Sequence, residues 1–138
     1  MLHKEEKQRQ AVEMLCTDML VPRDHLLRKI DAAVDFDRIY EFVEDLYCPD
    51  NGRPSVDPVV LFKMVLIQHL YGIRSLRQTV KDIELNVGYR WFLGYTMAQE
   101  IPHFATVSYA FANRFSEEVV ENVFRWILEE ANQAGFLS

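Results

Sequence analysis

Apolar residues recur every three or four positions along most of the chain, which is the spacing of amphipathic α-helices. No stretch alternates apolar and polar residues in the manner of a half-buried β-strand, and no internal repeat is present. The pattern therefore predicts an all-α fold, a compact multi-helix bundle. Its helices are expected to begin near Val12, Leu26, Phe36, Pro58, Ser75, Val87, Ala105 and Glu117.

Helix-capping residues and turn formers mark the boundaries of these segments. Asp24 and Asp35 are placed to cap the second and third helices, and Ser116 is placed to cap the last. Asp57, followed by a proline, opens the clearest helix, because a carboxylate cap and a proline in the first turn both favour a helix start. Residues 48–54 are dense in turn formers and are expected to form a loop.

The segment 59–70 is apolar nearly all round, which predicts a helix at the centre of the bundle. Leu61, Val65 and Leu66 are its expected core residues. Lys63 interrupts the apolar run, which is shorter than the roughly 20 residues that a membrane span needs. The charged amino terminus lacks the apolar core of a signal peptide. We therefore expect a cytoplasmic protein with no membrane partner.

The length of the chain, 138 residues, suits a single domain over residues 1–138, with residues 1–20 as a leading helix at its periphery. The chain has no glycine-rich phosphate loop, no GxSxG turn and no two-histidine helix motif. Cys16, Cys48 and the four histidines lack the spacing of metal ligands. We therefore expect a protein that is not an enzyme and has no metal, no cofactor and no small-molecule ligand.

The net charge of -6 is unevenly distributed along the chain. Residues 1–52 carry seven basic and twelve acidic side chains, residues 53–114 carry seven and four, and residues 115–138 carry one and five. A mildly basic middle segment therefore lies between acidic flanks. An acidic protein is a poor candidate for binding nucleic acid, but a local basic surface changes that expectation.

The basic side chains of the middle segment include a stripe on the helix predicted from Ser75 to about Leu85. Arg74, Arg77 and Lys81 follow each other at spacings of three and four, so they share one face. The apolar face opposite is formed by Leu76, Val80 and Ile83. Short helices joined by tight turns are also typical of a helix-turn-helix-like region. These features leave two interpretations open, a DNA-binding region and a plain packing domain.

Four blocks of sequence narrow this choice when they are taken together. Residues 52–63 read GRPSVDPVVLFK, and blocks at 21–30, 70–75 and 89–94 accompany them in order. The set resembles the amino-terminal helical domain of insertion-sequence transposases of the DDE type, whose signature is GRPxxDPVxLFK. The resemblance covers roughly residues 20–137.

The resemblance implies a DNA-binding and assembly domain that takes part in DNA transposition. Its partners would be DNA with the terminal inverted repeats of the element, and a second copy or a full-length transposase in a homodimer or mixed assembly. The catalytic domain of the family, with two aspartates and a glutamate, would lie beyond Ser138, so no catalytic residue is expected in this truncated chain. The protein would act in the cytoplasm of a prokaryote, associated with the nucleoid.

The sequence departs from the family pattern after residue 102. The family has an aspartate where this chain has His103, which predicts the loss of a helix cap worth about 1 kcal/mol. Of the arginine cluster that follows in the family, only Arg114 is present. Each lost phosphate contact would weaken DNA binding and its salt dependence.

Eight residues are therefore predicted to contact DNA, the basic ones at phosphates and the others at base edges. They are Arg74, Arg77, Lys81, Arg90, Ser108, Tyr109, Asn113 and Arg114. The alternative is a non-catalytic dimerisation module, derived from a decayed or repurposed transposase, that no longer binds DNA.

Overall fold

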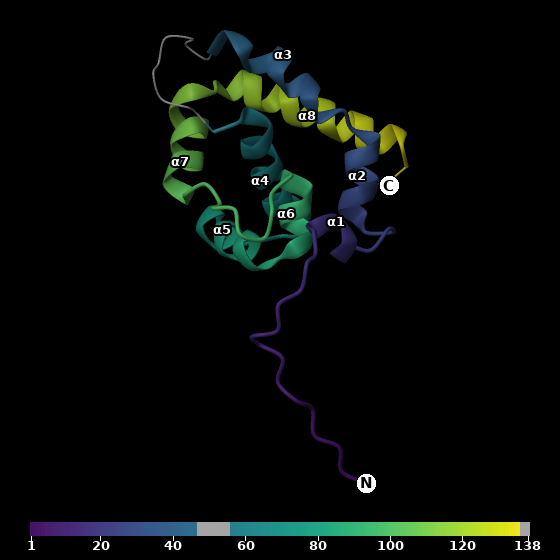
Figure 1. The fold of residues 1–138 in the computed structure, drawn as a ribbon. Coiled ribbons are helices and arrows are strands. Elements are labelled where there is room, and N and C mark those ends of the chain that lie inside the picture. Colours follow the sequence, from purple (N-terminus) through teal and green to yellow (C-terminus); the bar gives the residue numbers. More distant parts are fainter. Residues whose placement is uncertain (47–55, 136–138) are drawn as a thin grey trace.

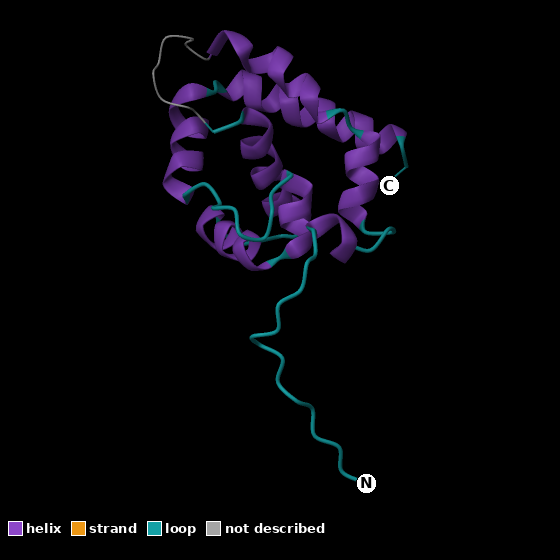
Figure 2. Ribbon diagram, in the orientation of Figure 1, coloured by secondary structure: helices purple, strands orange, loops and turns teal. Residues whose placement is uncertain are grey.

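The computed structural model describes residues 1–46 and 56–135, and within these ranges the chain folds into helices without any strand (Figures 1 and 2). The all-α fold predicted from the sequence is therefore confirmed. Two 3₁₀ turns flank α3, and a π-helical turn, Ala110–Arg114, continues α7. The helices are α1 (Thr17–Leu20), α2 (Leu26–Ala33), α3 (Ile39–Val43), α4 (Pro58–Leu70), α5 (Leu76–Leu85), α6 (Val87–Leu93), α7 (Phe104–Tyr109) and α8 (Glu117–Gln133).

Helix α4 is the central element of the bundle. In Figure 1 it lies between α3 and α8 on one side and α5 on the other, and it contacts α3, α5 and α6. Asp57 caps it as predicted, because one carboxylate oxygen accepts the Val59 backbone N–H at 2.8 Å. Leu61 and Leu66 are buried and Val65 is half-buried against the core, so the predicted central position is confirmed.

The core joins distant segments of the chain through aromatic contacts. The ring of Phe62 on α4 lies 5.0 Å from Phe111, 5.1 Å from Phe115 and 5.5 Å from Phe124, measured between centroids. These contacts connect α4 to the π-helical turn and to α8. Ring pairs at such separations add to the stability gained from burial alone.

Lys63 explains why a charged residue interrupts the most apolar helix. Its ammonium group donates to the Phe92 carbonyl at 2.8 Å and to the Asp31 carboxylate at 3.2 Å. It also lies 4.7 Å from the Phe36 ring centroid and 4.6 Å from that of Phe92. Lys63 thus connects α4 to α2 and α6 while its charge stays paired.

A second polar cluster holds α1 against α2 and α6. The Asp18 carboxylate accepts hydrogen bonds from Arg28 and from the Trp91 indole, both at 2.9 Å, and these bonds lower the pKa of Asp18. The Arg28 guanidinium lies 4.5 Å from the Trp91 ring centroid and also donates to the carbonyl of Val21 at 3.0 Å. The short helix α1 is therefore fixed by side chains rather than by its own length.

The prediction of the first helix is wrong over most of its length. Only Thr17–Leu20 is helical, and residues 1–16 extend away from the bundle with Val12 97% and Met14 98% exposed (Figure 1). Helical spacing alone does not stabilise a short helix, because isolated helices below about 12–15 residues are marginal without packing. No helix within the described ranges has the length and apolar character for crossing a membrane.

Two predicted caps also differ from the structure. His25, not Asp24, caps α2, and its Nδ1 accepts the Leu27 backbone N–H at 3.0 Å. Asp35 occupies the cap position of the first 3₁₀ turn, but its side chain makes no capping hydrogen bond. The predicted third helix is broken into α3 and its two flanking 3₁₀ turns. The predicted loop at residues 48–54 lies outside the described residues.

Candidate nucleic-acid interface

Helix α5 presents the predicted basic stripe to solvent. Arg74, Arg77 and Lys81 are all exposed, whereas Val80 and Ile83 on the opposite face are buried. The hydroxyl of the cap residue, Ser75, accepts the Gln78 backbone N–H at 3.0 Å, and the helix begins at Leu76, two residues after Arg74. Arg77 and Lys81 are therefore placed on a helix whose other side is fixed in the core, and Arg74 directly precedes its cap.

The connection between α4 and α5 is the nearest approach to a helix-turn-helix. It spans residues 71–75 and contains Gly72 at a φ of 60°, a left-handed conformation that favours glycine. By contrast, α5 and α6 are separated by Asn86 alone, and α6 and α7 by residues 94–103. A helix-turn-helix is not established by these lengths, so this region stays a prediction.

Helix α7 lies beside α5, and the side chain of Arg77 on α5 contacts Phe104, the first residue of α7. The guanidinium carbon of Arg77 is 4.1 Å from the Phe104 ring centroid. Ser108 and Tyr109, one turn further along α7, are exposed, and Val107 on the other face is buried. The structure therefore brings the basic stripe and these predicted base-reading residues onto two helices in contact.

Asn113 and Arg114 follow in the π-helical turn that extends α7. Asn113 is exposed, and its amide donates to the Tyr109 carbonyl at 3.3 Å. Arg114 is half-buried and is engaged with other residues of the chain. Both residues continue the surface that begins with Ser108.

Arg90 has a different environment from the other predicted DNA contacts. It is 5% exposed, and its guanidinium donates to the carbonyls of Glu84 at 3.0 Å and of Thr96 and Gln99, both at 2.7 Å. These bonds fix the chain between α6 and α7 to the end of α5. Arg90 therefore has a structural role in this placement, and we leave it out of the proposed contact surface.

His103 is a helix cap, and the predicted loss of a cap at this position is wrong. Its Nδ1 accepts the Ala105 backbone N–H at 3.0 Å, in the place where the family's aspartate oxygen would accept it. The imidazole ring also lies 4.5 Å from the Phe104 ring, centroid to centroid. Helix α7 thus starts with its cap satisfied.

A groove that no sequence pattern predicted runs between α5 and residues 98–104. It has a volume of about 660 Å³, and its lining includes Arg77, Lys81, His103 and Phe104. The sequence pattern indicated only a lost cap at His103 and did not single out Phe104, because the proximity of both residues to α5 depends on how α7 packs. In the described part of the chain, no three His, Cys, Asp or Glu side chains are placed to hold a metal ion.

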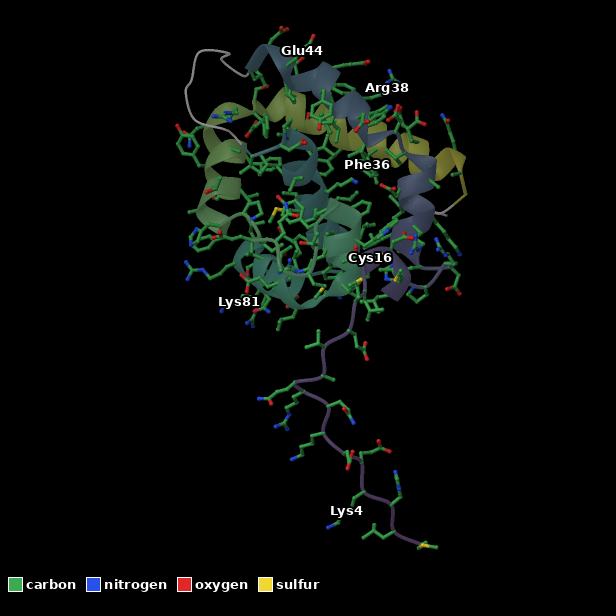
Figure 3. All side chains as sticks on the ribbon, in the orientation of Figure 1. Lys4, Cys16, Phe36, Arg38, Glu44 and Lys81 are labelled. Atoms are coloured by element: carbon green, nitrogen blue, oxygen red, sulfur yellow. The ribbon has the colours of Figure 1, made fainter. Side chains whose placement is uncertain are left out.

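The segments at the end of the molecule opposite α5 are strongly acidic. The segments 35–46 and 116–135, which include α3 and α8, contain ten carboxylates and two arginines. Figure 3 shows Glu44, in the 3₁₀ turn that follows α3, at one end and Lys81 on α5 at the other. The basic stripe is therefore separated from ten of the 21 acidic side chains of the chain, whereas Asp82, Glu84 and Glu100 lie close to it.

The fold and this surface define the class of protein, which is an all-α bundle with a basic face on one helix. The sequence comparison identifies the family: the chain matches the transposase domain family DUF772 over residues 15–113, well over half of its length, and belongs to that family. The matched region includes α1 to α7 and ends before α8. No curated protein and no solved structure matches the chain.

Proposed function

We propose that the chain is a DNA-binding and assembly domain of an insertion-sequence transposase, and that residues 1–138 do not themselves catalyse transposition. Membership of a transposase domain family supports the link to transposition. The observation that carries DNA binding is the exposed row formed by Arg74, directly before the cap of α5, and by Arg77 and Lys81 on α5, whose other face is buried. The DNA would be the terminal inverted repeats of the element.

In this proposal the two helices have different tasks. The cations of α5 contact phosphates and fix the position of the domain on the duplex, which gives affinity but no sequence information. Ser108, Tyr109 and Asn113 supply hydroxyl and amide groups that can reach base edges. The acidic side chains of α3 and α8 are repelled by the phosphates, so they favour the approach of the α5 end to DNA.

The salt dependence of binding tests this proposal. We expect the wild-type protein to bind a duplex with the element's terminal repeat, with log K falling linearly against log salt at a slope of about -3 for three phosphate contacts. Fluorescence anisotropy titrations at several salt concentrations measure the slope. A protein that shows no salt-sensitive binding to this duplex would contradict the proposal.

The absence of catalysis is the second part of the proposal. The two aspartates and one glutamate of the family's catalytic domain would lie outside residues 1–138, as the resemblance implies. Purified protein with Mg²⁺ or Mn²⁺ should therefore neither nick nor join DNA with the element ends. Metal-dependent cleavage that stays with the protein through purification would show that this part is wrong.

A second candidate function, self-association, is favoured by the extended arm formed by residues 1–16. Val12 is 97% and Leu15 is 52% exposed, a large exposure for apolar side chains at helical spacing. On α8, Phe124 and Leu128 line a surface groove with Glu121, Arg125 and Glu129, and they offer an apolar surface to the apolar side chains of the arm, which carries three basic and three acidic residues. Sixteen extended residues span about 50 Å, enough to reach a neighbouring molecule.

We therefore propose that the arm of one copy can dock on α8 of a second copy. Replacement of Val12 and Leu15 by serine should convert a dimer into a monomer, because these side chains of the arm supply the apolar contact. Light scattering coupled to gel filtration measures the mass, and Leu85→Ser, at a leucine 88% exposed on α5, is the matched control. A wild-type protein that stays monomeric at high concentration would contradict self-association.

A further inference from the structure

The groove between α5 and residues 98–104 has the dimensions and lining of a ligand site. Its volume of about 660 Å³ falls within the range of roughly 300–1,000 Å³ that is usual for small-molecule pockets. Val80 and Ile101 give it apolar walls, and both side chains are buried in the core. A ligand there would meet both apolar and charged surface.

The aromatic and cationic side chains of the groove are stacked. The Arg77 guanidinium carbon lies 4.1 Å from the Phe104 ring centroid. The His103 ring lies 4.5 Å from the same centroid at an interplanar angle of 33°. Flat rings and guanidinium planes are the surfaces on which unpaired nucleic-acid bases stack.

The charges of the groove favour a ligand with a single phosphate beside a neutral ring. Arg77 and Lys81 are exposed cations, but Glu84 and Glu100 also line the groove, so a free dianion gains little. The Arg90 guanidinium already donates to three backbone carbonyls. Glu84 can accept a hydrogen bond from an exocyclic base amine.

We propose that this groove binds an unpaired nucleotide of a DNA strand, with its base against Phe104 and His103 and its phosphate at Arg77 and Lys81. The inference rests on the proposed DNA binding and deepens it, because it names the form of DNA that is preferred. A base within a paired duplex is stacked on its neighbours and exposes only its edges in the grooves. The preferred DNA is therefore a strand end or another site with an unpaired base.

The test compares a blunt duplex with the same duplex extended by a short single-stranded overhang that contains 2-aminopurine. The wild-type protein should bind the overhang duplex about tenfold more tightly than the blunt one, a typical gain for one stacked base. The fluorescence of 2-aminopurine should fall on binding, because the base leaves solvent and stacks on a ring. Anisotropy and emission are measured on the same samples.

Variants of Phe104 separate stacking from phosphate contact. Phe104→Leu should reduce the tenfold preference, taken as the ratio of the overhang and blunt affinities of the same variant, to about twofold or less, whereas Phe104→Tyr keeps a ring and should keep the preference. Tyr71→Leu removes an exposed ring outside the groove lining and is the matched control.

Each result of this test has one meaning. A wild-type protein that binds both duplexes equally, or shows no change in 2-aminopurine fluorescence, overturns the nucleotide site and leaves the proposed DNA binding intact. Binding to neither duplex overturns both proposals. If Phe104→Leu fails to fold, as judged by circular dichroism, the emission change with wild type and with Phe104→Tyr still decides the question.

Discussion

Two histidines cap the amino-terminal ends of helices, and both do so through the Nδ1 atom. His25 at α2 and His103 at α7 each use Nδ1 to accept a backbone N–H two residues later, both at 3.0 Å. Histidine is not among the residues usually preferred at a helix start. Asp24 was therefore predicted as the cap of α2, and the cap of α7 was predicted to be lost. The geometry of the acceptor atom, rather than the residue type, satisfies the helix end.

Substitution of His103 tests this capping role. His103→Ala should lower the free energy of unfolding by about 1 kcal/mol, because the Ala105 N–H loses its acceptor. His103→Asp restores an acceptor and adds a negative charge that the helix dipole favours, so its stability should stay close to that of the wild type. Urea melts of the three proteins provide the comparison, and equal losses for both variants would contradict the capping role.

Tyr40 introduces a dependence of stability on alkaline pH. Its hydroxyl donates to the Asp57 carboxylate at 2.6 Å, and this bond, with partial burial, raises the pKa of Tyr40 to about 12. Because the folded pKa exceeds the unfolded value of 10.0, the contribution is complete below pH 10 and is lost as the pH rises toward 12. The hydroxyl must keep its proton for the bond to form.

The matched variant is Tyr40→Phe. The free energy of unfolding of the wild type should exceed that of Tyr40→Phe at about pH 9, and the difference should shrink at about pH 11.5. Tyr71, Tyr89 and Tyr95 also have raised pKa values through burial, but both proteins share them and they cancel in the comparison. A difference that is constant across this range would show that the Tyr40–Asp57 bond does not control it.

At the scale of whole elements, the sequence pattern correctly predicted those helices that have both a capping residue at their start and an apolar face buried in the core. Helices α4 and α5 begin directly after Asp57 and Ser75, and α8 begins directly after Ser116. These caps act within three residues, so the sequence contains the information. The helix predicted from Val12 had the spacing but no surface to pack against, and spacing alone does not supply that surface.

The same limit applies to the candidate interface. The stripe on α5 could be predicted, because Arg74, Arg77 and Lys81 are related by helical periodicity alone. The buried position of Arg90 could not be predicted, since two of its acceptors, Thr96 and Gln99, lie in the irregular segment between α6 and α7, and the third, Glu84, lies near the end of α5. The groove at Phe104 depends on α7 lying against α5, which is a tertiary contact.

Helix α4 should contribute more to stability than any other element. Leu66→Ala should lower the free energy of unfolding by about 2–5 kcal/mol, because Leu66 is 5% exposed and its truncation leaves a cavity. Leu85→Ala, at a leucine 88% exposed, is the matched control and should change stability by less than about 0.5 kcal/mol. Denaturant melts measure both, and a loss below about 1 kcal/mol for Leu66→Ala would place the core elsewhere.

At the scale of the whole molecule, the distribution of charge matters more than its sum. The net charge of -6 arises mainly from the segments that include α3 and α8, at the end of the bundle opposite α5 (Figure 3). A protein that is acidic overall can therefore present a basic face to DNA. Because screening limits such effects to about 10 Å at 0.1 M salt, the acidic side chains of α3 and α8 have little effect on the stripe, and the nearby Asp82, Glu84 and Glu100 have more.

The most direct test of this account is the affinity of a charge-matched pair of triple variants for element-end DNA. Replacement of Arg74, Arg77 and Lys81 by glutamine should abolish binding and leave the helical circular dichroism spectrum unchanged, because α5 packs through Val80 and Ile83. Replacement of Lys29, Arg38 and Arg125 removes the same charge from α2, the 3₁₀ turn before α3, and α8, and should retain binding. Equal affinity of the two variants in anisotropy titrations would contradict a DNA-binding role for the α5 stripe.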